Sequence, residues 1–394
     1  APNPPYTSVV SFWPGPVGFG SSNYLYGVAN PDLTWESVIT KNAGVDISFL
    51  NGRIETAIDV YKKVTSQMLL IGTGPRLIGV GDQWDDLKGP VINTGRMSNT
   101  GIDFSLTSTN IRNKDLTWKT NIIFSQFKNK LEKVAGDLAA LYGRIYYDNY
   151  LISRTIPGFA VGSFFGLKTD GLYRTQDDLN NSLPQFGYSV DQTHTWLGDV
   201  RYKDVSGADG KPDGVIDEKD ITFIGSPLPK FTYGFTNTVN YKNFDFSVFI
   251  QGSHGAKIFN FLRWQLEKMD NPYYNQLRSV MDRYTDVNTD GKLPRFTNTN
   301  VNNVYMSDRY VEDGSYLRIQ NIAIGYRIPA KYLSKAKIST ARVYITVQNL
   351  HTFTNYSGYD PEVGVFNNNI RLTNVDAGHY PNPRSFTAGI NLEL

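Results

Sequence analysis

The stretch Phe231–Gly252, FTYGFTNTVNYKNFDFSVFIQG, has the pattern from which we predict the fold. If Lys242 and Asn243 form a two-residue turn, Tyr241 lies opposite Phe244 and every further pair of the two strands follows. Because strand side chains alternate between two faces, this one register makes one face apolar and the other polar. The apolar face carries Phe235, Val239, Phe246, Val248 and Ile250, and the polar face carries Asp245, Ser247 and Gln251.

Two hairpins earlier in the chain repeat this pattern. The first turns at Asn51-Gly52, the dipeptide best suited to a type I′ turn. For the second we predict a three-residue loop centred on Lys114, because that register places Phe104 opposite Phe124 and keeps the two faces distinct. Both hairpins therefore have an apolar and a polar face, as the first stretch does.

A fourth hairpin and a last strand follow later in the chain. The hairpin joins Tyr316–Ile328 to Ala341–Leu350 through a segment that we expect to contain a short helical turn. The alternation of Tyr316–Gln320 does not continue cleanly into Ile322–Tyr326, so we predict a bulge there. The last strand, 383–394, has on its apolar face Phe386, Ala388, Ile390, Leu392 and Leu394.

Long polar stretches separate the hairpins. We expect loops at 1–31, 71–97, 131–230, 253–308 and 351–382, with one short strand near Ser163–Tyr173. The order is therefore short turn, long loop, short turn, long loop. We count about nine strong strands, many of ten or more residues, whereas ordinary globular strands have about five or six.

Long alternating strands with short turns at one end and long loops at the other are typical of outer-membrane β-barrels. A bilayer leaves no exposed backbone polar group without a partner, so such strands must close into a barrel. Aromatic residues beside the turns, Phe49, Tyr241 and Phe244, fit the aromatic girdle of a membrane interface. The alternative interpretation is a soluble β-sandwich or a large extracellular β-domain, whose strands also alternate.

The composition limits the possible functions. The 394 residues include 25 Tyr, 22 Phe and no Cys, and the formal net charge is +2, which gives no field for a nucleic-acid partner. There is no run of about 18 apolar residues of the kind that forms a transmembrane helix. The first residues contain neither Met nor a signal peptide, so we expect the chain to be the interior of a longer one.

No catalytic motif is present, and we predict that the protein is not an enzyme. The four histidines lie far apart in loop-like sequence and without metal-binding spacing: His194, His254, His351 and His379. The glycine-rich run at 72–81 contains a proline and has no flanking βαβ pattern, so it does not indicate a phosphate-binding loop.

The acidic segment 204–220 is the one candidate ion site, for Ca²⁺; no cofactor is otherwise required. Its candidate ligands fall at positions 1, 5, 9 and 12 of an EF-hand-like loop: Asp209, Asp213, Asp217 and Asp220. Gly214 falls at position 6, where such loops turn sharply. Lys211 at position 3 departs from that pattern, and an acidic turn without metal is the alternative reading.

Several segments, in order along the chain, resemble the SusC/RagA family of TonB-dependent outer-membrane transporters. The longest is DGVIDEKDITFIGSPLPKFTYGFTNTVNYKNFDFSVFIQGSHG at 213–255. The others are NPDLTWE at 30–36, the run at 44–63, VEDGSYLRIQNIAIGYRIP at 311–329 with ARVYITVQNL after it, NYSGYDPEVG at 355–364 and the closing run at 380–394. The similarity extends from about residue 30 to the end of the chain.

This resemblance implies an all-β fold, in which residues 1–394 are the C-terminal part of a 22-stranded transmembrane antiparallel β-barrel with long extracellular loops. The plug domain, the TonB-contacting segment and the first barrel strands have no counterpart in this sequence. The family usually ends in an aromatic residue, whereas this chain ends in Leu394. In this orientation Lys242-Asn243 is a periplasmic turn and Asp209–Asp220 belongs to an extracellular loop.

The resemblance also implies import of glycans or peptides across the cell outer membrane, with TonB energy and a SusD-like lipoprotein as lid. The partners would then be that lipoprotein, the TonB complex, the remaining barrel and plug, the lipid bilayer and the substrate. Candidate sugar-stacking residues in the loops are Trp84, Tyr146, Tyr147 and Trp196. A soluble or surface lectin or adhesin, or a passive porin, is the alternative function.

Overall fold

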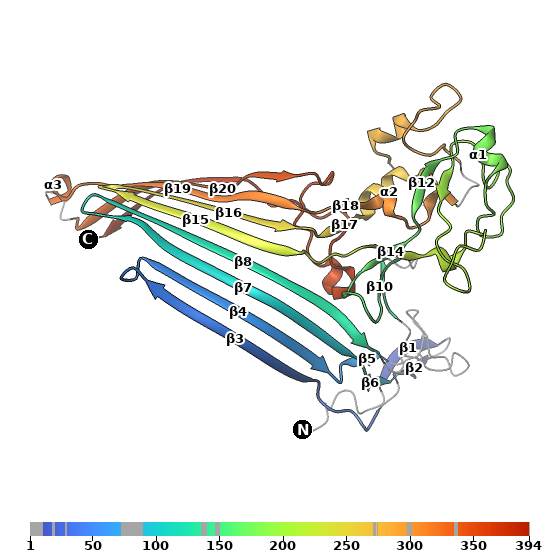
Figure 1. Cartoon of the computed structure of the whole chain (residues 1–394), viewed down its shortest axis with the longest axis horizontal. Helices are drawn as coiled ribbons and strands as arrows, with labels where there is room; N and C mark the ends of the chain where they lie inside the picture. Colours follow the sequence, from blue (N-terminus) through green and yellow to red (C-terminus); the bar gives the residue numbers. More distant parts are fainter. Residues whose placement is uncertain are drawn as a thin grey trace.

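The computed structural model describes residues 11–17, 20–27, 30–71, 90–134, 140–145, 150–270, 273, 275–297, 302–334 and 338–393. Its main feature is one antiparallel sheet of nine strands in the order β22-β20-β19-β16-β15-β8-β7-β4-β3 (Figure 1). These strands are β3 (Ser37–Phe49), β4 (Ile54–Ser66), β7 (Arg96–Arg112), β8 (Leu116–Lys133), β15 (Phe231–Tyr241), β16 (Phe244–His254), β19 (Tyr316–Arg327), β20 (Thr340–Thr354) and β22 (Ser385–Glu393).

The hairpin β15–β16 has the predicted register at every pair. Tyr241 lies opposite Phe244, Val239 opposite Phe246, and the pairing continues without a shift to the far ends of both strands. The hairpin β3–β4 turns as predicted at Asn51 and Gly52, which have φ angles of 54° and 75°. Leu50 has a φ of 56°, so the loop between Phe49 and Ile54 contains three consecutive residues with positive φ.

The predicted irregularities of the sheet are confirmed too. Strands β7 and β8 are joined by residues 113–115, and Phe104 lies opposite Phe124. The register of β19 shifts between Ile319 and Asn321 against β20, at the place where the sequence alternation fails. The helical turn between β19 and β20 is α3 (Ala330–Leu333).

Most of the large apolar side chains of the sheet lie on one face, and many are exposed. Phe246, Ile324, Ile345 and Ala388 are partners in turn across β16, β19, β20 and β22. In that row the side chains of Ile324 and Ile345 are 52% and 60% exposed. A soluble monomer rarely exposes a continuous apolar face of this extent, so this face needs a non-aqueous environment.

The buried core lies instead in the long connections. One cluster of buried side chains consists of Ile145, Ile152, Phe164, Phe259, Phe261, Trp264, Tyr310, Leu372 and Val375. A second consists of Leu167, Leu172, Val200, Tyr202, Ile216 and Tyr284. Segments far apart in the sequence supply each cluster, so the connections fold together into a compact region of their own.

That region contains more regular structure than the sequence predicted. Its elements are β9 (Leu141–Ile145), β10 (Tyr150–Thr155), β11 (Phe164–Gly166), β12 (Thr169–Leu172), α1 (Gln176–Asn180), β13 (Val200–Tyr202), β14 (Thr222–Gly225), β17 (Lys257–Asn260), α2 (Phe261–Glu267), β18 (Val311–Asp313) and β21 (Val375–Asp376). The single strand expected near Ser163–Tyr173 is thus two short strands. These strands are too short to show an alternation, and apart from the neighbouring pair β9 and β10 their partners are distant in sequence.

The expected loop at 1–31 is also partly wrong. It contains a hairpin of β1 (Ser11–Val17) and β2 (Gly20–Gly27). The expected glycine-rich loop at 71–97 lies mostly outside the described residues, and it is flanked by the small pair β5 (Leu69–Ile71) and β6 (Val91–Asn93). The sequence showed only the turn-forming residues here, and not the pairings.

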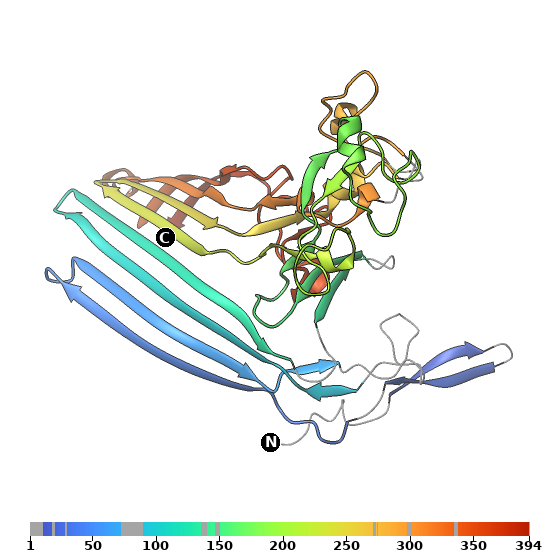
Figure 2. The same ribbon diagram turned by 45° about the vertical axis from the view of Figure 1, so that its right-hand side comes forward.

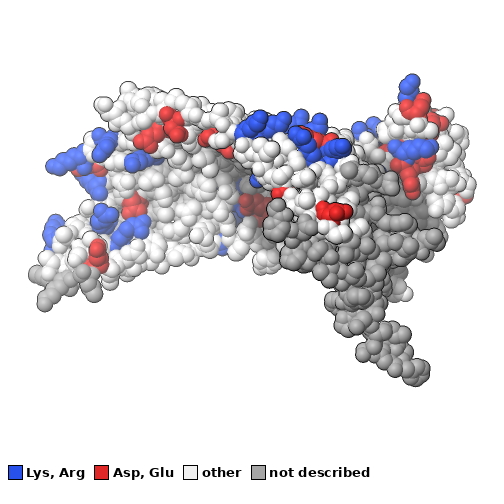
Figure 3. Space-filling view, turned by 90° about the horizontal axis from the view of Figure 1, so that it is seen from below, with Lys and Arg blue, Asp and Glu red and all other residues white. Residues whose placement is uncertain are grey.

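The nine strands form a curved sheet with its short turns gathered at one end and the folded region at the other (Figures 1 and 2). Strands β3 and β22 are the two edges of the sheet. Lys and Arg side chains lie at the short-turn end (Figure 3), where the turns contribute Arg53, Lys114 and Lys242. This division of short turns and long connections matches the prediction.

The register of β16 makes a test of the two faces possible. Val248 lies on the apolar face and Ser247 on the polar face. If the apolar face meets hydrocarbon, Val248→Arg will place a charge near the bilayer midplane, at a cost of about 2–4 kcal/mol. We expect Val248→Arg to lower the yield of heat-modifiable, folded barrel in outer-membrane fractions, and Ser247→Arg to leave it nearly unchanged. Equal yields from the two variants would show that the face assignment is wrong.

Candidate functional site

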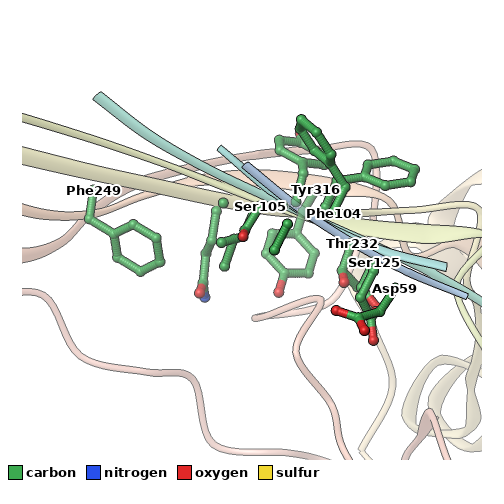
Figure 4. A pocket seen from close by; sticks show the side chains of 15 residues that line it. Asp59, Phe104, Ser105, Ser125, Thr232, Phe249 and Tyr316 are labelled. Carbon is green, nitrogen blue, oxygen red and sulfur yellow. The ribbon is translucent and has the colours of Figure 1, made fainter. Parts of the chain in front are cut away.

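The polar face of the sheet is one candidate site. Asp59, Asp103, Ser125 and Thr232 are partners in turn across β4, β7, β8 and β15. The Ser125 hydroxyl donates to Asp103 Oδ1 at 2.5 Å. These residues line an open cavity of about 460 Å³, in which Asp59, Ser125 and Thr232 lie together on one side of the strands (Figure 4). The wall therefore offers hydroxyl and carboxylate groups to a polar solute.

Glycines on the polar face let larger side chains lie across their neighbours. A Cβ at Gly325 would stand 2.5 Å from both Asp245 Oδ1 and Arg342 Nε. Because Gly325 has no side chain, Arg342 of β20 crosses β19 and donates to Asp245 of β16, with Nε 2.9 Å from Oδ1. Tyr61 lies over Gly101 in the same way. On the polar face, large side chains therefore lie flat across the glycines of neighbouring strands.

At the long-loop end, the segment 355–382 folds back onto the polar face and is held by Arg318. The Arg318 side chain is 2% exposed, and its guanidinium donates to Asp360 Oδ1 at 2.6 Å. It also contacts a carboxylate oxygen of Glu362, and it donates to Thr352 Oγ1 at 2.8 Å. Tyr316 of the same strand donates to Glu362 from its hydroxyl at 2.7 Å. One arginine thus joins the barrel wall to the loop.

The partners of Asp360 keep its carboxylate charged. Burial opposes ionisation, but the backbone N–H groups of Glu362 and Asn382 and the Arg318 guanidinium outweigh it and lower the pKa of Asp360 from the usual 3.8. A lowered folded-state pKa stabilises the contact above the unfolded-state pKa. This contribution is present at neutral pH, and it is lost as the pH falls below about 3.8 and through the lowered pKa.

Further buried contacts position the same segment. Tyr356 donates from its hydroxyl to Asp376 Oδ2 at 2.6 Å, and burial followed by this hydrogen bond raises the pKa of Tyr356. Glu312 of β18 accepts from Arg263 Nη1 at 2.7 Å and from the Ser357 backbone N–H at 2.9 Å. The segment therefore forms hydrogen bonds both with the folded region and with the sheet.

The structure describes one of the four candidate sugar-stacking residues. Trp196 is half-buried in the folded region, and its backbone N–H donates to Asp199 Oδ2 at 2.7 Å. Asp199 in turn is held by Arg295, whose Nε lies 2.8 Å from Oδ1. Trp84, Tyr146 and Tyr147 lie outside the described residues. The role of all four in stacking on a substrate stays a prediction.

The four candidate calcium ligands have other partners. Asp220 is buried and accepts from the backbone N–H groups of Val205 and Asp217, at 2.7 and 2.8 Å. Lys219 Nζ lies 3.0 Å from Asp217 Oδ2 and 3.4 Å from Asp213 Oδ2. Asp209 accepts from the backbone of Lys211. Among the described residues, no three acidic, His or Cys side chains gather as metal ligands.

Sequence reasoning did not single out Arg318, Asp360 or Glu362 as site residues. The available signal was Arg318 itself, a charged residue at a polar-face position of a largely apolar strand, YLRIQNIAIGYRI. Such a residue needs a buried partner, because an unpaired buried charge is strongly unfavourable. The sequence could not show which of the many acidic residues supplies it.

The fold and its two faces define the class: the sheet has the architecture of part of a TonB-dependent transporter barrel. The RagAB peptide transporter superposes with a TM-score of 0.75 at 22% identity, covering 98% of this chain and 38% of that one. A structure of the RagAB peptide importer in the "closed-closed" state gives 0.74 at 23% identity. At these identities the likeness shows the fold alone.

Sequence comparison shows which TonB-dependent proteins the chain is related to. TonB-dependent receptor P3 of Formosa agariphila is 35% identical over 378 residues, which are 94% of this chain and 35% of the receptor. TonB-dependent receptor SusC of Bacteroides thetaiotaomicron is 28% identical over 383 residues, 93% of this chain and 32% of the receptor. The chain is thus a homologue of SusC-type TonB-dependent receptors, and it spans about a third of their length. No family model matches it.

These relatives are named as receptors and transporters, which fits the prediction that the protein is not an enzyme. In the described residues, no helix is long and apolar enough to cross a membrane.

The attachment of segment 355–382 can be tested through Arg318. Arg318→Met leaves Asp360 and Glu362 without their cation, and breaking a buried pair in this way costs about 3–5 kcal/mol. We expect faster hydrogen exchange throughout 355–382 in the folded receptor, with β15 and β16 unaffected. Arg327→Met, an exposed site on the same strand, is the matched control and should not change the exchange. Unchanged exchange in Arg318→Met would mean that other contacts hold the segment.

Calcium binding by the 204–220 loop stays a prediction. A bound ion would have to displace Lys219 from Asp213 and Asp217. If the loop binds Ca²⁺, calorimetric titration of the receptor will show heat of binding that Asp213→Asn removes and Lys219→Met strengthens. A titration without heat in both the native receptor and Lys219→Met would exclude the site.

Proposed function

We propose that this chain is part of a SusC-type importer of the cell outer membrane, which takes up glycans or peptides with energy supplied through TonB. The observation that carries the proposal is the amphipathic nine-stranded sheet, whose apolar face is exposed and whose polar face is lined by hydroxyl and carboxylate groups. A lectin or adhesin in water has no use for so much exposed apolar surface, and a barrel wall in lipid requires it.

The edges of the sheet support a larger barrel. Strands β3 and β22 each have one side without a neighbouring strand among the described residues. Open sheet edges are not tolerated in hydrocarbon, because backbone N–H and C=O groups there have no water to bind. We propose that β3 and β22 pair with strands of the same receptor outside this chain, and that a plug domain and TonB-contacting segment belong to that remainder.

The folded region at the long-loop end is the proposed site of the lid and the entry of substrate. The chain is similar in sequence to SusC of Bacteroides thetaiotaomicron and in fold to RagAB, which is named as a peptide transporter. By analogy we propose a SusD-like lipoprotein as partner on this region. The hydroxyl and carboxylate groups of the wall can bind either a glycan or a peptide. The uptake experiment below therefore compares the two substrate classes.

Uptake by living cells tests the import proposal. We expect cells to accumulate a labelled oligosaccharide or short peptide only when they contain both the native receptor and a functional TonB. Deletion of the receptor and deletion of TonB should each abolish uptake. Arg327→Met, an exposed substitution, serves as the control for expression and assembly. Uptake that survives loss of TonB would instead indicate a passive porin.

A further inference from the structure

Four lysines gather on the apolar face at the long-loop end of the sheet. Lys41 of β3 lies directly opposite Lys62 of β4. Lys62 is the partner of Thr100 in β7, and Thr100 is the partner of Lys128 in β8. Lys130 is the next residue of β8 on the same face. All four lysines are exposed.

On β8 the row that contains Lys128 begins where the apolar band ends, whereas on β3 and β4 the next row of the same face carries Ile39 and Val64. The preceding row on the same face carries Ala43, Val60 and Ile102. Along β8 the band extends from Leu116 to about Gln126, which is about 34 Å at roughly 3.4 Å per residue. A strand tilt of about 40° turns this length into a height of about 26 Å, and the apolar band of such barrels is about 25 Å tall. The lysine row therefore lies at the level of lipid headgroups.

The cluster has one carboxylate nearby, Glu132, which interacts electrostatically with Lys62. Among the described residues, none of the four forms an ion pair with a carboxylate, and the neighbouring Glu132 is bound to Arg96 at 2.8 Å. Like charges directly opposite each other, as in the pair Lys41–Lys62, destabilise a sheet. Figure 3, seen from below, shows a group of Lys and Arg side chains near the middle of the molecule's length, beside the folded region. An external anion would relieve this repulsion.

We propose that the cluster Lys41, Lys62, Lys128 and Lys130 binds the phosphate of a membrane-lipid headgroup in the leaflet at the long-loop end. Lys62 and Lys128 flank Thr100 on two strands separated by β7, about 10 Å apart at roughly 4.8 Å per strand spacing. A phosphate between them is attracted by both ammonium groups, each of which acts as a point charge. It also accepts a hydrogen bond from the Thr100 hydroxyl. Its acyl chains lie along Val60 and Ile102.

The position of Trp35 agrees with a lysine row at the level of the lipid headgroups. Trp35 directly precedes β3 at the same end and is 46% exposed. Tryptophan is enriched at the boundary between hydrocarbon and headgroups. The lipid proposal rests on the proposed membrane placement, but it does not depend on import or on the substrate, because the cluster is on the face opposite to the cavity wall.

Native mass spectrometry of the complete receptor tests the proposal. The probes are nanodiscs of phosphatidylcholine doped with lipid A, with dephosphorylated lipid A or with phosphatidylglycerol. We expect retention of the phosphorylated lipids, and a loss of about 30-fold in Lys62→Gln/Lys128→Gln, from the attraction typical of two lysines at a membrane surface. The matched control Lys63→Gln/Lys119→Gln removes the same charge from the polar face and should retain lipid as the native receptor does.

Each contrary outcome has a distinct meaning. Equal retention by the two double variants, or equal retention of lipid A with and without phosphate, overturns the proposal. If Lys62→Gln/Lys128→Gln keeps its lipid but loses a co-purifying lipoprotein, the cluster contacts an acidic protein surface and the proposal is also wrong. Heat-modifiable migration of each variant confirms the folded barrel. A receptor that never enters nanodiscs contradicts the membrane placement itself.

Discussion

The constraint on which the structure depends is the pair of faces, one apolar and one polar, that nine antiparallel strands share. Each strand bonds to its neighbours through backbone groups, and the side chains alternate with period two, so every strand has to match the same pair of faces. A slip of one residue in β15 would move Phe235 and Val239 to the polar side and would expose Thr236 and Thr238 to lipid. The hydrophobic environment therefore fixes the register of all nine strands together.

The bulge in β19 shows how strictly this constraint is kept. The pairing shifts between Ile319 and Asn321, and the register against β16 shifts at the same place. As a result Ile319 and Ile322 both stay on the apolar face although two residues separate them. The bulge therefore keeps the side chains before and after it on their proper faces. Arg318 lies on the polar face, where the segment 355–382 contacts it.

Charge has three separate roles on this sheet. Within the polar face, Asp245 and Arg342 neutralise each other across a glycine. At the end of the wall, Arg318 forms ion pairs with Asp360 and Glu362 and so helps to attach the segment 355–382. On the apolar face, Lys62 interacts only with Glu132, which Arg96 already binds, and Lys128 forms no ion pair among the described residues, so we propose an anion of the membrane as their counter-charge.

The sequence by itself determined the hairpins of the sheet, their registers, the turn at Asn51-Gly52 and the bulge near Gln320, whereas the order in which the hairpins pair came from the tertiary structure. These are local, because each follows from alternation and turn chemistry within about thirty neighbouring residues. Only the tertiary structure decided how the long connections fold and which residues meet at the wall. Their strands are short, and a strand partner can be more than a hundred residues away, as for Phe259 of β17 and Val375 of β21. No periodicity reports such a pairing, and charge alone did not show that Arg318 binds Asp360, because many carboxylates could have served.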